Sequence, residues 1–168
     1  LPFPLAARFG GVALTLADRL ELEGRSRPVA LLVFDGARWR LELRHGERRA
    51  AAEGRLERSL AAADLDGSEP LAAIERAADA VGAGIVHVEN LDRMPLDGLA
   101  QLAARRSLVL STHDFALHCP NVQLLEAATG RFCGYCRELE RCRRCLAATP
   151  GSAGVDPARH RAAAARLF

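Results

Sequence analysis

Four cysteines in the last third of the chain have the spacing of a metal site. They form the pattern C-x2-C-x5-C-x2-C in the stretch RFCGYCRELERCRRCL, and their positions are Cys133, Cys136, Cys142 and Cys145. Each C-x2-C pair can present two thiolates to one point, and two pairs can complete the tetrahedral shell that Zn²⁺ prefers. Four protein ligands leave no position for a reacting water, so the pattern predicts a structural zinc.

The separation between the two pairs keeps other interpretations open. Five residues are fewer than zinc fingers usually have there, so two disulfides, an iron–sulfur cluster or four free thiols are also compatible, with zinc preferred to iron. The fifth cysteine, Cys119, fits a small buried apolar side chain as well as a site residue. Two C-x2-C pairs favour an intracellular compartment, so we expect a cytoplasmic protein, free or peripheral to the membrane.

A second group of polar residues ends two apolar segments. The segment GIVHVEN contains His87, Glu89 and Asn90, and the segment SLVLSTHD ends in His113 and Asp114. If both segments are parallel strands, their carboxyl ends meet at one edge of a sheet, and these side chains line one crevice where a substrate can bind. A helix cap or loop position for His113 and a hydrogen-bonded core position for His87 are the alternatives.

A glycine pair near the start of the chain is a weaker signal. Gly10 and Gly11 precede a helical pattern, and the exposed N–H groups of a helix start suit a phosphate or another anion. Glycines also occupy turns for steric reasons, and the dinucleotide fingerprint G-x-G-x-x-G is absent. The pair is therefore a candidate substrate-binding element only in combination with other features.

The apolar pattern predicts the elements that position these residues. A helix follows Gly11, and the apolar run 29–34 and the alternating segment 38–44 are strands that an Asp-Gly turn can join into a hairpin. The Ala-, Arg- and Glu-rich region 48–66 fits a helix or a connector. Beyond it, helices and strands alternate from residue 70 to residue 114, which predicts an α/β fold: a Rossmann-like, mostly parallel sheet with helices on both faces, plus a Cys-rich loop.

Composition and charge exclude some classes of protein. All 23 basic residues are arginines, and with 21 acidic residues the formal net charge is +2, so no nucleic-acid partner is expected from charge. No apolar run is long enough for a transmembrane span, and no segment has the order of a signal peptide. The arginines around the cysteines fit a solvated face more readily than a nucleic-acid finger.

Two stretches resemble a known family. GGVALTLADRLELEGRSRPVALLVF and GIVHVENLDRMPLDGLAQLAARRSLVLSTHDFALHCPN are similar to the amino-terminal, acceptor-side domain of the group 1, family-4 retaining glycosyltransferases, which have the two-domain GT-B fold. Many members of that family carry a cysteine-bearing loop after a segment like HDFALHCP. The most specific part of the resemblance is STHDFALHCPN.

The resemblance implies transfer of a sugar from a nucleotide-sugar donor to an acceptor, with retention of the anomeric configuration. Gly10 and Gly11 would lie near the donor diphosphate, and His113 would face the transferred sugar as a catalytic residue. His87 and Asn90 would form part of the acceptor-side wall. Neither the sugar, the nucleotide nor the acceptor follows from the residues.

The chain also departs from the family pattern. The strand expected before the glycine pair and the carboxyl-terminal, donor-binding domain are both missing, so residues 1–168 read as one amino-terminal domain truncated at both ends, with the metal loop 131–146 inside it. Such a chain would be inactive by itself. The alternative is a zinc-stabilised, non-catalytic module that binds a protein or a nucleic acid.

Overall fold

The structure, a computed structural model, describes residues 11–168 in two compact units. The first unit contains residues 11–59 and 72–84, and the second contains residues 60–71 and 85–168. Helix α3 (Ser68–Ala80) has its first turn in the second unit and the rest in the first. In the described part of the chain no helix is both long and apolar enough to cross a membrane.

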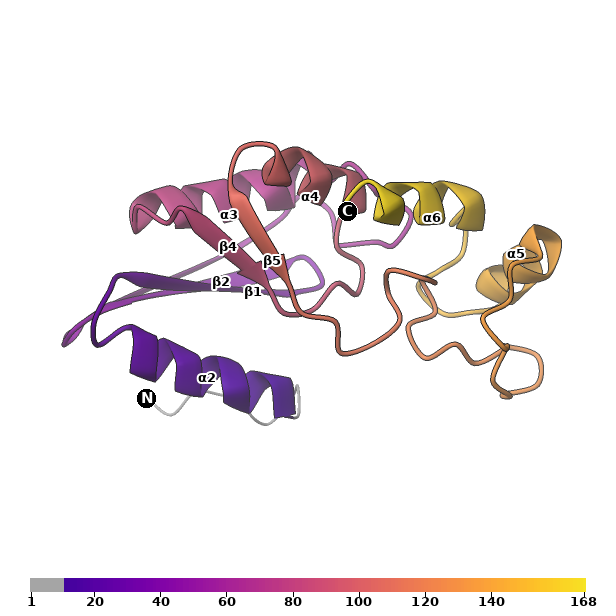
Figure 1. Cartoon of the computed structure of the whole chain (residues 1–168), viewed down its shortest axis with the longest axis horizontal. Helices are drawn as coiled ribbons and strands as arrows, with labels where there is room; N and C mark the ends of the chain where they lie inside the picture. The colour runs from indigo at the N-terminus through magenta and orange to yellow at the C-terminus, as the bar shows by residue number, and fades with distance from the viewer. Residues whose placement is uncertain (1–10) are drawn as a thin grey trace. The chain divides into compact units, whose positions relative to one another are not determined.

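The first unit contains a helix and an antiparallel sheet. Helix α2 (Gly11–Glu23) packs on the first of three strands, which pair in the order β1-β2-β3 and are β1 (Val29–Asp35), β2 (Arg38–His45) and β3 (Arg48–Arg55) (Figure 1). Both connections are two-residue loops whose glycine, Gly36 or Gly46, has a φ of 60°. A glycine with positive φ at the first loop position is typical of tight hairpin turns. The predicted first helix and the predicted hairpin are confirmed.

The sequence pattern of the residues in strand β3 fits a helix or a connector, and the structure shows a strand. It is an exposed edge strand whose alanines Ala50 and Ala52 stand opposite Leu43 and Leu41 of β2. Alanine, arginine and glutamate have little strand propensity of their own. The two-residue loop after β2 places residues 48–55 directly alongside β2, and pairing with β2 therefore makes them a strand.

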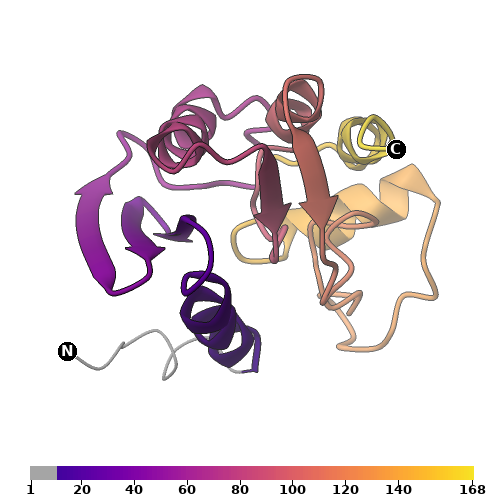
Figure 2. The same cartoon turned by 60° about the vertical axis from the view of Figure 1, so that its left-hand side comes forward.

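The second unit contains a parallel pair of strands and three complete helices. Its elements are β4 (Ile85–Val88), α4 (Leu96–Ala103), β5 (Ser107–Leu110), α5 (Leu139–Ala147) and α6 (Pro157–Ala165). Strands β4 and β5 pair from Ile85↔Ser107 to Val88↔Leu110, and Figure 2 shows the two arrows side by side in the same direction. The intervening helix α4 is the crossover that a parallel connection requires.

The predicted Rossmann-like, mostly parallel sheet is wrong. The described strands form a three-stranded antiparallel sheet and a separate two-stranded parallel sheet. The physical reason lies in the connections: a two-residue loop can join only antiparallel neighbours, and both loops of the first sheet are of this kind. The parallel arrangement is thus limited to β4 and β5.

Two apolar clusters organise the second unit. The first joins α4 and α6 and consists of buried Leu65, Leu96, Ala163 and Ala164, with Leu117 and Leu167 packed against it. The second consists of buried Ala62, Leu146 and Val155, with Cys119 packed against it. Because Leu146 belongs to α5, the second cluster attaches the cysteine-bearing region to the rest of the unit.

Candidate functional site

Two histidines and a glutamate meet at the carboxyl ends of β4 and β5. The Glu89 carboxylate contacts both rings: Oε1 is 3.3 Å from His87 Nε2, and Oε2 is 3.1 Å from His113 Nε2. Only 9% of the Glu89 side chain is exposed, whereas 46% of His113 is exposed. We call these three residues the histidine–glutamate cluster, in which a shielded carboxylate holds one ring that faces solvent.

Strand pairing sets the positions in this cluster. His87 lies opposite Val109, and its Nε2 is 2.8 Å from the hydroxyl of Ser111, just after β5. The Ser111 amide donates to the Val88 carbonyl at 2.9 Å and extends the parallel ladder by one residue. The two strand ends therefore bring His87 and His113 together, as an arrangement of parallel strands requires.

The neighbouring candidates Asn90 and Asp114 hold the adjoining loops. Asn90 Oδ1 accepts a hydrogen bond from the Asp92 amide at 2.8 Å, and Asp114 Oδ1 accepts one from the Ala116 amide at 2.8 Å. Burial raises the pKa of Asp92; Arg93 opposes the shift and the negative charge of Asp114 adds to it. The Asp92 and Asp114 carboxylates are therefore close enough to interact. In the sequence, each lies within three residues of a member of the histidine–glutamate cluster.

The glycine pair is only partly described. Gly10 lies outside the described residues, and Gly11 is the first residue of α2 in the first unit. The prediction that both glycines bind the donor therefore stays a prediction.

All five cysteines of the chain line one small cavity in the second unit. Cys119, Cys133, Cys136, Cys142 and Cys145 surround a space of ≈ 20 Å³. This volume admits about one water-sized body, because one water needs at least about 10–15 Å³ by the same measure. We call this space the cysteine cavity; it is far too small for a nucleotide sugar.

Local backbone geometry turns the cysteines toward this cavity. Cys142 and Cys145 lie three residues apart on α5 and so share one face of the helix. Between Cys133 and Cys136 the backbone is left-handed at Gly134 (φ 68°) and Tyr135 (φ 55°), which reverses the chain between the two thiols. No two of the five form a disulfide.

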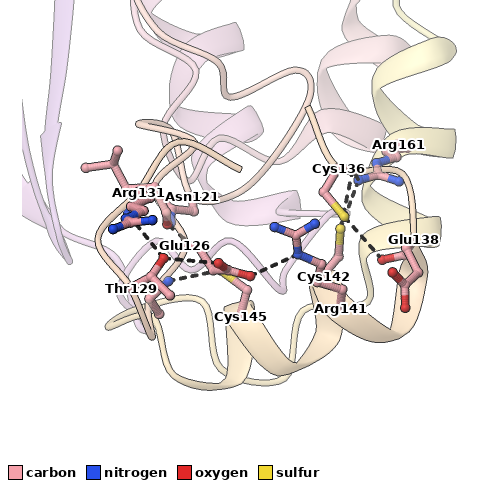
Figure 3. A network of polar contacts seen from close by, with 12 residues as sticks. Asn121, Glu126, Thr129, Arg131, Cys136, Glu138, Arg141, Cys142, Cys145 and Arg161 are labelled. Carbon is pink, nitrogen blue, oxygen red and sulfur yellow. Dashed lines mark hydrogen bonds and ion pairs between the residues drawn. The ribbon is translucent and has the colours of Figure 1, made fainter. Parts of the chain in front are cut away.

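Donors from other segments point at the sulfurs. The Ala127 amide lies 3.4 Å from Cys145 Sγ, and Arg161 of α6 places Nη2 3.3 Å from Cys142 Sγ and 2.6 Å from the Cys136 carbonyl (Figure 3). Burial raises the pKa of the Cys142 thiol above its usual value, and the hydrogen bond from Arg161 offsets part of this shift. Hydrogen bonds of this kind stabilise thiolates and commonly surround metal-bound sulfur.

An ion pair closes the loop against α5. Arg141 Nε donates to Glu126 Oε1 at 2.9 Å, and Glu126 also accepts from the Thr129 hydroxyl at 3.1 Å (Figure 3). These hydrogen bonds, that from Arg141 first, lower the pKa of Glu126. The contact ties the loop before Cys133 to the helix that carries Cys142.

Comparison with models of known protein families, with curated proteins and with solved structures found no match. Among the residues that the structure describes, no three His, Cys, Asp or Glu side chains stand in a metal-coordinating arrangement.

Sequence reasoning gives a site role for Cys119 only as one of two alternatives, and it missed Arg161 of the cysteine cavity. Cys119 joins the other four cysteines although it lies 14 positions before Cys133 in the chain. Arg161 reaches the cavity from an Ala- and Arg-rich helix that carries no motif. Only the proline after Cys119, which favours a fixed turn, hinted that this cysteine has a defined position.

A buried histidine fixes the segment between the two sites. His160 of α6 is 5% exposed, and its Nε2 donates to the Ala116 carbonyl at 2.6 Å, midway between His113 and Cys119. Burial lowers the pKa of His160, and Arg161 and His118 lower it further, while the bond to Ala116 opposes the shift. The folded protein therefore holds this ring neutral.

This arrangement predicts loss of stability in acid. As the pH falls below about 6.5, the His160 ring becomes protonated in the unfolded chain but stays neutral in the folded chain. The free energy of unfolding should therefore drop by up to ~1.4 kcal/mol per pH unit, until the pH reaches the pKa of His160 in the folded protein. Urea titrations at pH 7.5 and 5.5 measure the change. In His160→Gln the pH-dependent loss should be smaller than in the wild type; an equal loss would assign the effect to other groups.

Proposed function

We propose that this chain forms the acceptor side of a retaining glycosyltransferase that takes a sugar from a nucleotide-sugar donor. The observation that carries the proposal is the histidine–glutamate cluster, in which Glu89 holds His87 and His113 at the carboxyl ends of two parallel strands. Side chains at such strand ends are the usual ligand-binding groups of parallel sheets. The stretch STHDFALHCPN resembles the family-4 retaining glycosyltransferases, and this resemblance implies that the transferred sugar would lie beside His113.

The roles within the cluster follow from exposure and contact. His113, nearly half exposed, is the group that can reach a hydroxyl of the transferred sugar. The Glu89 carboxylate accepts a hydrogen bond from the His113 ring and fixes the orientation of that ring. A neighbouring carboxylate often orients a proton-transfer histidine in this way. His87 and Asn90 form part of the wall of the acceptor site. The glycine pair and a second domain bind the donor diphosphate.

We propose in addition that the cysteine cavity holds a structural zinc ion. Five thiols converge on a space of ≈ 20 Å³, and N–H donors from Ala127 and Arg161 already contact two of the sulfurs. Soft donors in a closed set fit zinc, and a complete thiolate shell has no position for a reacting water. The ion would hold the loop in place and take no part in sugar transfer.

Turnover of nucleotide sugars tests the enzyme proposal. The complete protein that carries this chain should release nucleoside diphosphate from one member of a panel of nucleotide sugars, and the product should keep the donor's anomeric configuration by NMR. The 168-residue chain alone should release none. Turnover by the isolated chain, or a product of inverted configuration, would contradict the proposal.

A non-catalytic binding module is the second candidate, and exposed aromatic rings favour it. The Tyr135 ring packs edge to face on Phe115 and Phe132 at centroid distances of 5.7 and 5.3 Å, and the three rings are 41–56% exposed. Exposed apolar groups of this kind often mark interaction surfaces. Metal content without any turnover in the complete protein would favour this candidate.

A further inference from the structure

An open groove lies beside the cysteine cavity in the second unit. Its volume is ≈ 400 Å³, and it shares His118 and Arg161 with the cysteine cavity as common wall residues. Small-molecule sites generally have volumes of about 300–1,000 Å³. The groove is therefore large enough for a small organic ligand. It is lined by Leu117, His118, Arg137, Arg161, Ala164, Ala165 and Phe168.

The two arginines give this groove, which we call the arginine groove, a positive charge. None of its lining residues is acidic, and no carboxylate in the described part of the chain forms an ion pair with Arg137 or Arg161. On α5, by contrast, Arg141 is paired with Glu126 and Arg143 with Glu140. Two cations without acidic partners beside one groove favour an anionic ligand.

Hydrogen bonds fix Arg161 at the groove. From α6 it donates through Nη2 to the Cys136 carbonyl at 2.6 Å, and its Nη1 lies 3.5 Å from the Arg137 carbonyl (Figure 3). Neutral carbonyls hold a guanidinium group without cancelling its charge. The same contacts position the backbone of Arg137, so one arginine places the other at the groove.

The neighbouring thiols offer Arg161 a second use for its charge. Its Nη2 is 3.3 Å from Cys142 Sγ, and a thiolate there would offset part of the positive charge. Arg137 differs, because its exposed side chain makes no hydrogen bond or ion pair with any described residue. Arg137 is therefore the cation that a ligand of the groove can use fully.

The rest of the groove has an apolar lining with a fixed position. Leu117 packs against the apolar cluster that joins α4 and α6, and Ala164 is a buried member of that cluster. An inorganic ion would contact the arginines alone and leave this lining exposed. A ligand with a larger body would cover the apolar side while its anionic group binds the guanidinium groups.

We propose that the arginine groove binds a small organic phosphate, with the phosphate at Arg137 and Arg161 and the organic body on Leu117 and Ala164. Guanidinium groups bind phosphate through paired N–H donors, and a phosphate has enough acceptor oxygens for two of them. The site goes beyond the proposed function: it shares no residue with the histidine–glutamate cluster, and it requires neither sugar transfer nor a bound metal.

Calorimetric titration of the complete protein tests the proposal with glucose 6-phosphate as the probe. We expect wild type to bind glucose 6-phosphate, and to bind glucose and inorganic phosphate at least about 10-fold more weakly. Arg137→Ala should weaken binding of glucose 6-phosphate by about 10–100-fold, the effect of a lost hydrogen bond to a charged group. The matched control is Arg131→Ala, an exposed arginine of the same loop that does not line the groove, which should bind as wild type does.

Chemical modification gives a second measurement that needs no variant. Glucose 6-phosphate should protect Arg137 of the wild type from phenylglyoxal, while Arg131 stays reactive in peptide maps. Unchanged binding in Arg137→Ala, or labelling of Arg137 in the presence of the probe, would overturn the site. Inorganic phosphate that binds as tightly as glucose 6-phosphate would overturn the organic ligand, and so would binding to phosphatidic acid vesicles that glucose 6-phosphate does not reduce. Each readout is binding, so none depends on glycosyltransferase activity.

Discussion

Removal of the proposed zinc with a chelator is expected to raise backbone amide exchange across residues 125–145 by at least about 100-fold, while β4, α4 and β5 keep their protection. The reason is that metal-binding energy in a small loop is folding energy for that loop. Among residues 125–145, all of which the structure describes, Cys142 alone is buried. Leu124 and Leu146, on either side of this loop, are both buried, so the loop 125–145 is anchored at its ends and has almost no apolar core of its own between them. Hydrogen–deuterium exchange with mass spectrometry measures the effect.

The control for this experiment is the addition of zinc to the chelated protein, which should restore protection in the same peptides. If peptides around Leu96 and Ala163 lose protection together with the loop, the metal supports the core of the whole second unit. That result would contradict a local role, and unchanged exchange after chelation would contradict a metal-dependent loop.

The sequence pattern predicted local elements better than their assembly. The helix of 11–23 and the hairpin after Val29 follow from residue periodicity and an Asp-Gly turn, and both are confirmed. The helix–strand alternation between residues 70 and 114 predicts a mostly parallel sheet, but only β4 and β5 pair in this way. The Asp-Gly turn that predicts the hairpin also makes β1 and β2 antiparallel, and the sheet that they form with β3 is separate from the parallel pair.

The two candidate sites differ in how far sequence could predict them. His87 lies near the end of β4 and His113 follows the end of β5, and the pairing of these two strands brings both histidines to Glu89. Cys119 and Arg161 approach the cysteine cavity through packing of α5 and α6, and Arg161 contacts a residue 25 positions away in the chain. No spacing rule encodes such a contact, because it depends on where two helices meet.

For the proposed glycosyltransferase, His113→Ala in the complete protein is expected to lower kcat/KM for sugar transfer by about 10²–10⁴-fold, the range that a positioned proton-transfer group contributes. Glu89→Gln should reduce kcat by a smaller factor, because the ring of His113 stays in place and loses only its charged partner at 3.1 Å. The matched control is His45→Ala, an exposed histidine at the end of β2 in the first unit, which should leave kcat/KM unchanged.

The pattern across these variants separates a reacting group from a structural one. If His113 only held the loop together, His113→Ala would lower the urea midpoint of unfolding in parallel with activity, and Glu89→Gln would do the same. Because nearly half of the His113 side chain is exposed, its removal should change stability by no more than about 0.5 kcal/mol. A large loss of turnover with an unchanged urea midpoint therefore assigns His113 to the chemistry, whereas retained turnover in His113→Ala would remove the histidine–glutamate cluster from the mechanism.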